Sequence, residues 1–562
     1  MSAVAGVLDC RPVSTVMDLE RLGTLYPYPL SFMRCLVRRI MTEGWSITRT
    51  KFELDADGYG DAVYKIDTGN DTFNFVIFSH YLDSEDRSDR VIAEAWDMTA
   101  TLCAGDLTDD RLARLKANVP LQEAGRVDCE CFVLTRANKS SRNFNYVVDC
   151  LVQGKQPDVN LIAKVGYLFR TTAVYGSGKF GMADWEKVCH RYPDFSRPFM
   201  GEMLACFLIR QFSLELADWV AVNRAPETAA TLSNDIKRYF GIGNATGLGM
   251  APYLINHPSL ISNWIHVKEA ALSEVIQKGK PDASALDRFH AIGKKAIQHL
   301  LEISTDNIDQ NQLNKSARTE AKTVLDWVQS TKLSSWHNLI EYCSQNMGVE
   351  TQELINSILL EVHKDLIIGL EEKLSVNEVY QLKPEMSLSK AKNIIETAYD
   401  WALSTDYSDA SAFETFWYRS EEKMEPRLGQ RSKDIGAEKE MLLGIAWAVQ
   451  CCYDDLQDYC AKEGNKSVGE FVFHYPKHRY ILRRVQTMAD TAFGEIRANV
   501  LDEGVLPIQL LRCKLSFFGV GKFDPKSKLW VRNTMFQGAP LTSDMGKPFK
   551  DDWFFPVMQS NG

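Results

Sequence analysis

The order of apolar and polar residues along the first part of the chain predicts a mixture of helices and strands. Ser31–Thr42 has apolar residues at helical spacing, so we expect a helix there, within a helical lead-in over residues 1–55. Residues 61–67 (DAVYKID) and 71–82 (DTFNFVIFSHYL) are rich in β-branched and aromatic residues, as strands are. The turn formers between them, residues 68–71, are typical of a hairpin. A helix over Arg90–Cys103 and strands at 127–136 and 143–152 are expected to follow.

The middle of the chain carries mainly helical patterns, and the last third is mixed. Pro198–Val222 is apolar nearly all round, which predicts a buried helix. Further helices are expected at Ala283–Ile303, Ala317–Gln329, Glu350–Glu372, Leu388–Leu403, Ala437–Ala461 and Ile481–Leu501. Strands are expected at residues 510–518 and 528–536.

These patterns predict a predominantly helical α+β protein. The N-terminal α+β segment holds a small, mainly antiparallel sheet, the middle is helical, and the C-terminal part is mixed. At 562 residues, the chain exceeds the size at which one core keeps growing. We therefore expect three domains: an α+β domain over 1–155, a helical domain with a glycine-rich break over 156–375, and a mixed domain over 376–562.

Composition narrows the class of protein. The net charge of −10 argues against a general nucleic-acid binder, which normally carries a basic stripe. The N-terminus lacks the positive start and long apolar centre of a signal peptide, and the apolar runs are too short for a membrane span. The 13 cysteines include no CxxC pair, as expected for reduced thiols. We expect a cytoplasmic protein without nucleic-acid or membrane partners; self-association into a homo-oligomer stays open.

The strongest local signal is Gly241–Pro258 (GIGNATGLGMAPYLINHP), a glycine-rich stretch expected between two helices. Glycine lets another group approach the backbone closely, and backbone N–H groups at the start of a helix bind anions. Asn244 and Thr246 can add directed hydrogen bonds to such a ligand. The alternative is tight packing of elements, in which the glycines serve only for proximity.

A second signal is Arg170–Gly181 (RTTAVYGSGKFG), which offers Arg170 and Lys179 to an anion. It is not a P-loop, because only one residue separates Gly176 from Gly178, and Phe180 follows the lysine. We expect a polar turn that binds the anion, with a surface loop of solvated charges as the alternative.

The third signal is Phe416–Arg431 (FWYRSEEKMEPRLGQR). Pro426 interrupts what would otherwise be a helix laced with ion pairs, so the charged residues are expected to line a site. Arg419, Arg427 and Arg431 are then anion ligands, since arginine captures carboxylate or phosphate in a bidentate manner. Glu425 is the candidate general base. A solvent-exposed charged face is the alternative.

Histidine supplies the remaining acid/base candidates. His80 and His257 each adjoin polar turn residues, although a structural histidine is the commoner case. No HExxH motif or facial-triad spacing occurs, so no metal and no cofactor are expected.

Together these segments suggest a cytoplasmic enzyme that acts on a small anionic metabolite, carrying carboxylate or phosphate, by acid/base and electrostatic catalysis. A lyase, an isomerase and a transferase all fit. One alternative is a non-catalytic scaffold or ligand-sensing regulator. Another is a kinase-like enzyme with a strand Lys65 and a helix Glu94, although no HRD-like or DFG-like string follows.

Overall fold

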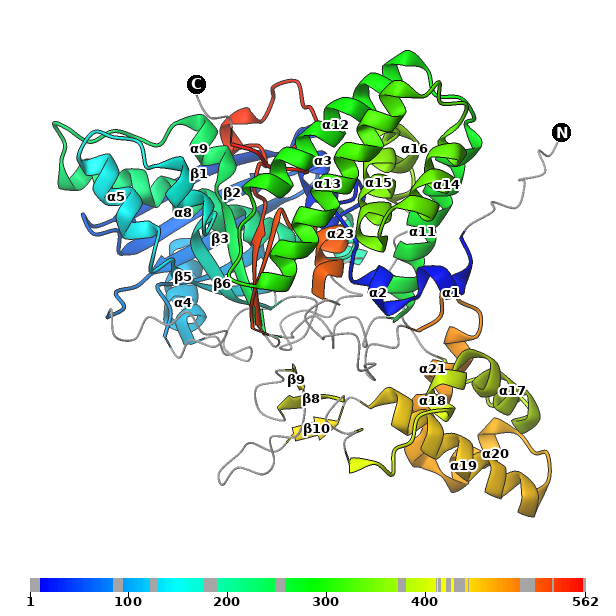
Figure 1. Ribbon diagram of the computed structural model, residues 1–562. Helices are drawn as coiled ribbons and strands as arrows, with labels where there is room; N and C mark the ends of the chain where they lie inside the picture. Colours follow the sequence, from blue (N-terminus) through cyan, green and yellow to red (C-terminus); the bar gives the residue numbers. More distant parts are fainter. Residues whose placement is uncertain are drawn as a thin grey trace.

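Figure 1 shows the chain as a computed structural model. The structure describes residues 11–83, 95–121, 130–175, 190–247, 258–371, 381–410, 412, 416–420, 426–428, 440–442, 444–495, 511–527 and 530–558. The structure describes only the backbone, and not the side chains, of residues 175, 245–247, 417–420, 426–428, 440–442, 514, 527 and 530.

Nine strands of the described chain form one large sheet. They are β1 (Ser46–Leu54), β2 (Gly60–Asp67), β3 (Thr72–Ser79), β4 (Met98–Ala104), β5 (Cys131–Lys139), β6 (Tyr167–Tyr175), β7 (Gly241–Gly247), β11 (Lys522–Ser527) and β12 (Trp530–Met535). Their order across the sheet is β1-β2-β3-β4-β5-β6-β7-β12-β11. Neighbours run antiparallel except β6 and β7, which run parallel. The helix-rich α+β class is therefore right in outline, but the sheet is mixed and much larger than predicted.

The β2–β3 hairpin confirms the predicted pair of strands. Thr68 N donates to the Asp71 carbonyl oxygen over 3.1 Å, and Gly69 N donates to Asp67 Oδ1 over 2.9 Å. Gly69 has a φ of 86°, in the left-handed region that glycine adopts without strain. The turn chemistry in the sequence thus sets the register of this hairpin.

Several predicted elements are wrong in whole or in part. Residues 46–54 of the expected helical lead-in form β1, and the helix expected at Ala437–Ala461 includes strand β10 (Glu440–Leu442) and begins only at Ile445. The helix expected over Arg90–Cys103 is contradicted by β4, which covers its C-terminal part, while residues 90–94 lie outside the described chain. The strand expected at 143–152 is helix α5 (Phe144–Val152), whose buried Phe144, Val147, Val148 and Leu151 follow helical spacing. The strand expected at 510–518 is a 3₁₀ turn followed by helix α23 (Lys514–Phe518).

Helices cover both faces of the sheet. On one face lie α3 (Phe32–Thr42), α5 and the long, buried α8 (Met200–Arg224). Helices α3 and α8 were both predicted from the sequence. Phe169 of β6 meets Phe212 of α8 on this face, with ring centroids 6.2 Å apart. On the other face, α4 (Asp109–Asn118) packs Leu115 against a second, smaller apolar cluster that includes Val76 and Leu134.

A helical body stands beside the sheet in Figure 1. It consists of α11 (Pro258–Gln277), α12 (Ala283–Glu302), α13 (Ile308–Ser330), α14 (Trp336–Asn346), α15 (Val349–Val362) and α16 (Asp365–Ile368). Helix α15 contacts α11, α12, α13 and α14, and most of its residues are buried. Four short helices lie elsewhere along the chain: α1 (Val13–Val16), α2 (Leu19–Leu22), α6 (Val159–Ala163) and α9 (Asn234–Tyr239).

A smaller lobe lies below the rest of the molecule in Figure 1. It contains α17 (Leu388–Ala398), α18 (Asp400–Leu403), α19 (Ile445–Glu463), α20 (Val468–His474), α21 (Arg479–Met488), and the three-stranded sheet of β8 (Trp417–Ser420), β9 (Pro426–Leu428) and β10 (Glu440–Leu442). Phe493 N joins it to the helical body by donating to Ser262 Oγ of α11 over 3.3 Å.

The chain returns to its first sheet near its C-terminus. Strands β11 and β12 lie beside β7, so segments from all three predicted domains contribute to one sheet. The three domains predicted at residues 1–155, 156–375 and 376–562 stay a prediction as separate folding units.

Candidate functional site

Strands β6 and β7 bring together two of the three segments that the sequence singles out. Arg170 lies opposite Gly243, and Thr171 lies opposite Asn244. Cross-strand neighbours share a face, whereas consecutive residues of a strand point to opposite faces. Arg170 and Asn244 are therefore close in the sheet, but their side chains lie on opposite faces.

Residues 241–247 of the glycine-rich break form strand β7, and residues 248–257 lie outside the described chain. Gly241 and Gly243 lie in β7, and the structure gives a reason for each in packing. A Cβ on Gly243 would come within 2.6 Å of the Tyr167 ring, and one on Gly241 within 2.2 Å of the Met535 carbonyl oxygen. Close packing of neighbouring elements therefore accounts for these two glycines. Residues 170–175 of the expected polar turn belong instead to strand β6, and residues 176–181 lie outside the described chain.

The other candidate residues are only partly described. Arg419 lies opposite Pro426 and Met441 in the small sheet, Arg427 lies opposite Tyr418, and Thr246 lies opposite Val531; for these, only the backbone is described. Lys179, His257, Glu425 and Arg431 lie outside the described residues, as does Glu94 of the kinase-like alternative. Their roles stay predictions.

One row of cross-strand neighbours runs over five strands of the sheet. Asn138 of β5 lies opposite Arg170 of β6, which lies opposite Gly243 of β7. Gly243 lies opposite Thr534 of β12, and Thr534 lies opposite Lys522 of β11. Two residues further along, Arg532 of β12 lies opposite Asp524 of β11. We call this side of the sheet the polar face, defined by Asn138, Arg170, Lys522, Asp524 and Arg532.

Burial makes the polar face unusual. Arg170 is 3% exposed, Arg532 4% and Lys522 4%. Buried cations are rare in proteins unless they are paired, because leaving water costs a charged group free energy. The side of the sheet on which they gather is therefore a candidate site for anionic groups.

The β11 end of the polar face has defined contacts. Lys522 Nζ donates to the carbonyl oxygens of Ala163 and Lys164, at 2.7 and 2.9 Å, where α6 ends. Burial lowers the pKa of Lys522 to about 8, against the opposing attraction of Asp524. Lys526 Nζ lies 2.7 Å from Asp524 Oδ2 and 2.7 Å from Asp306 Oδ2. Lys522 therefore adds positive charge to the face while two of its three donors bind backbone carbonyls.

A histidine stands at the opposite end of the polar face. Thr99 of β4 lies opposite Arg136, which is two residues before Asn138 and so shares its face. His80 Nε2 lies 3.0 Å from Thr99 Oγ1, which holds the imidazole at this face. Burial lowers the pKa of His80 below its ordinary value, so the ring is neutral near pH 7 and can accept a proton.

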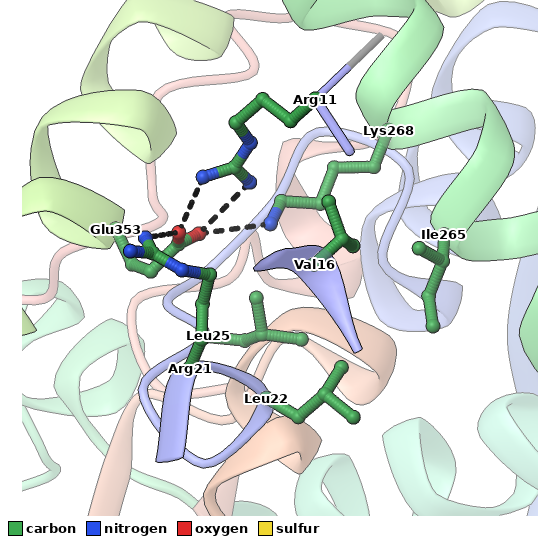
Figure 2. Close-up of a pocket in the computed structure, with 8 residues that line it drawn as sticks. All are labelled: Arg11, Val16, Arg21, Leu22, Leu25, Ile265, Lys268 and Glu353. Carbon is green, nitrogen blue, oxygen red and sulfur yellow. Dashed lines mark hydrogen bonds and ion pairs between the residues drawn. The ribbon is translucent and has the colours of Figure 1, made fainter. Parts of the chain in front are cut away.

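A second group of buried charges surrounds a cavity between the N-terminal segment and the helical body (Figure 2). The cavity is lined by Arg11, Val16, Arg21, Leu22, Leu25, Ile265, Lys268 and Glu353. Its volume is about 10 Å³, the room of roughly one water molecule. A metabolite does not fit.

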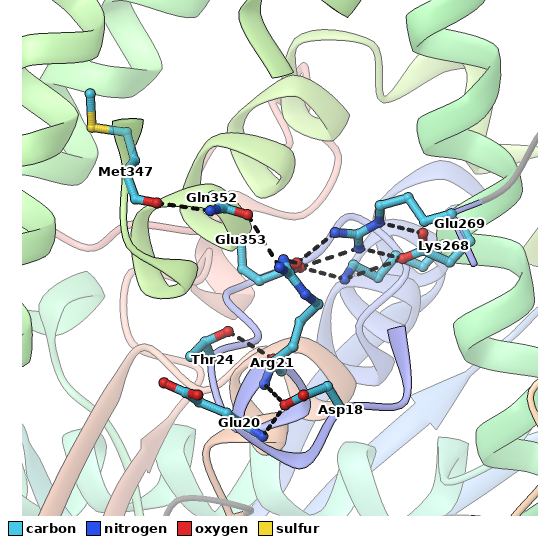
Figure 3. A network of polar contacts seen from close by, with 10 residues as sticks. Asp18, Glu20, Arg21, Thr24, Lys268, Glu269, Met347, Gln352 and Glu353 are labelled. Carbon is cyan, nitrogen blue, oxygen red and sulfur yellow. Dashed lines mark hydrogen bonds and ion pairs between the residues drawn. The ribbon is translucent and has the colours of Figure 1, made fainter. Parts of the chain in front are cut away.

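The charges around this cavity are already paired. Glu353 of α15 accepts hydrogen bonds from Arg11 at 2.7 Å, Arg21 at 2.6 Å and Lys268 at 3.1 Å. Burial alone would raise the pKa of Glu353, but these cations outweigh it and hold that pKa far below its usual range. Figure 3 shows Arg21 also reaching Gln352, which in turn donates to the Met347 carbonyl oxygen. This network fastens the N-terminal segment to α15, and its role is structural.

Comparison with family models, with curated proteins and with solved structures found no match to this chain. Within the described residues, no group of three or more His, Cys, Asp or Glu side chains is placed to hold a metal ion. No helix in this described part of the chain is both long enough and apolar enough to cross a membrane.

Sequence reasoning missed Lys522, Asp524 and Arg532. Residues 522–526 alternate charged and other residues with a period of two, which is the signal of a strand with one charged face. That signal could have placed Lys522, Asp524 and Lys526 on one side of a strand. Only the fold shows that this side faces the same way as Arg170.

Proposed function

We propose that this protein is a cytoplasmic enzyme that binds a small anionic metabolite on the polar face and acts on it by acid/base and electrostatic catalysis. The observation that carries the proposal is the placement of Arg170 and Arg532, both buried, on one face of the sheet. Arg170 and Arg532 are separated by β7 across the sheet and by two residues along β12, so their Cα atoms are about 12 Å apart. Two arginine side chains at that spacing can reach one small ligand.

The proposed chemistry follows from the groups on this face. Arginine holds carboxylate or phosphate through paired N–H donors, and fixed cations in a buried site stabilise negative charge that develops during a reaction. His80, held by Thr99 of β4, stands four strand spacings or about 19 Å from β12, too far to transfer a proton to a ligand held by Arg532. Lys522 strengthens the positive potential of the site without contacting the ligand.

The test is ligand binding measured by thermal shift with inorganic phosphate and with citrate. We expect both anions to raise the melting temperature of the wild type, because a ligand that binds only the native state stabilises it. Arg532→Gln should weaken binding by about tenfold or more, since it removes a buried charge partner. Arg224→Gln is the matched control, because Arg224 is exposed at the end of α8 and pairs only weakly with Asp57, at 3.4 Å. Equal binding by Arg532→Gln and the wild type, or no anion binding at all, would contradict the proposal.

A further inference from the structure

Asp524 has one carboxylate oxygen whose hydrogen-bonding capacity is unused. Its side chain is buried, with 1% exposed. Oδ2 lies 2.7 Å from Lys526 Nζ, whereas Oδ1 has no hydrogen-bond partner among the residues that the structure describes. A buried polar atom without a partner costs free energy, and the cost is larger for a charged group than for a neutral one. A partner from outside the chain would remove that cost.

The position of Asp524 indicates where such a partner would come from. Asp524 lies directly opposite Arg532 in the antiparallel β11–β12 pair, so both side chains stand on the polar face. Side chains in directly opposed positions begin about 5 Å apart. An anion held by Arg532 therefore lies within reach of Asp524 through a substituent on a neighbouring atom of the same ligand.

The neighbouring cations leave Oδ1 for a ligand. Lys526 is shared between Asp524 Oδ2 and Asp306 Oδ2. The ammonium of Lys522 donates to two backbone carbonyls at the end of α6. The ion pair with Lys526 thus orients Asp524, and the carboxylate oxygen Oδ1 remains able to accept a hydrogen bond from a ligand.

We propose that Asp524 accepts a hydrogen bond from a hydroxyl or ammonium group of the ligand, and that the substrate is therefore an anion with a hydrogen-bond donor beside it. Hydroxycarboxylates, amino acids and hydroxyl-bearing phosphate esters share this chemistry. The inference rests on the proposed function and narrows its substrate class. Asp524 selects among anions, while Arg170 and Arg532 bind the charge that all anions share.

The experiment compares ligands that differ only in the donor. Dissociation constants are measured by calorimetry for L-lactate and L-alanine against propionate, and for glycerol 3-phosphate against methyl phosphate. The wild type should bind at least one donor-bearing ligand about tenfold more tightly than its donor-free partner. Asp524→Ala should abolish this preference, and circular dichroism would show whether it folds. Asp524→Asn, which keeps the shape of the side chain, should reduce the preference.

Asp306→Asn is the matched control. It removes the other carboxylate that pairs with Lys526, but the Asp306 side chain is 78% exposed and leaves Asp524 Oδ1 unchanged. The donor preference should survive in this variant. Equal affinity of wild type for both members of every pair would overturn the inference, since a water molecule would then satisfy Oδ1, while the anion site itself would stand. If no anion binds, the proposed function fails and this inference fails with it.

Discussion

At the scale of single residues, buried charges hold the ends of the chain in place. Asp551, near the C-terminus, accepts hydrogen bonds from Arg34 Nε at 3.0 Å and Arg38 Nη2 at 2.9 Å. Burial alone would raise the pKa of Asp551, but the two arginines outweigh it and lower that pKa to about 2. The carboxylate therefore stabilises the fold above its unfolded pKa of about 4, and this contribution is lost as the pH falls toward 2.

Removing this charge should destabilise the protein strongly. Asp551→Asn leaves Arg34 and Arg38 buried with one charge partner fewer, and breaking a buried ion pair costs about 3–5 kcal/mol. The free energy of unfolding in urea measures the loss. Asp552→Asn is the control, since the next residue is exposed. Similar stabilities for the two variants would show that the Asp551 contacts contribute little.

His299 gives the fold a dependence on pH in a higher range. Burial lowers its pKa to about 4, and the ring bonds the Pro556 carbonyl oxygen through Nδ1 at 2.8 Å. The unfolded chain takes up this proton near pH 6.5, before the folded chain does. Stability should therefore fall by about 3 kcal/mol as the pH drops from about 6.5 to 4. Unfolding free energies measured across this range should show a shallower slope in His299→Gln, and an unchanged slope would exclude His299 as the cause.

At the scale of elements, the structures of β7 and α15 depend on the elements packed against them more than on their own sequence patterns. The glycines of β7 admit the Tyr167 ring and the backbone of β12. Helix α15 carries Glu350, Glu353 and Glu361, whose partners include Arg512, Arg21 and Arg34 respectively. A helix with so many carboxylates resembles a solvent-exposed one in sequence, yet here it lies in the core.

Gly243 provides a test of the packing role of β7. Gly243→Ala should destabilise the protein by about 1–3 kcal/mol, the usual cost of overpacking a core, because the added methyl meets the Tyr167 ring. The control is Gly369→Ala, where a Cβ meets nothing within 4 Å, and this change should be neutral or slightly stabilising. Thermal unfolding compares the two variants. If Gly243→Ala left stability intact but abolished anion binding, the anion-loop interpretation would replace the packing one.

Elements with a strong local signal could be predicted, whereas strand β7 could not. Helix α8 is apolar all round and the β2–β3 hairpin has turn formers, so both follow from local pattern. Strand β4 (MTATLCA) is buried on both faces, but it alternates Met98, Ala100 and Leu102 with Thr99 and Thr101, a strand signal that the helical prediction for this segment overlooked. Strand β7 contains three glycines and gives no strand signal at all. Of the polar face, Arg170 was singled out from the sequence, but Lys522, Asp524 and Arg532 join it through pairings across more than 350 residues.

At the scale of the whole molecule, the C-terminal strands complete the polar face. Arg170 comes from the first third of the chain, and Arg532 arrives from the last with β12. The sheet therefore joins groups that no local segment contains. The central claim is that anions bind on this side of the sheet and not on the side of α8.

One measurement tests that claim most directly: the dissociation constant for inorganic phosphate in Arg170→Gln and in Asn244→Ala. These residues occupy consecutive cross-strand positions but opposite faces, and Asn244 Nδ2 donates to Thr171 Oγ1 at 3.0 Å on the α8 side. We predict that Arg170→Gln weakens binding by about tenfold or more, as expected for loss of a buried charge partner, and that Asn244→Ala binds like the wild type. Weakened binding in Asn244→Ala together with wild-type affinity in Arg170→Gln would place the ligand on the other face and contradict the account.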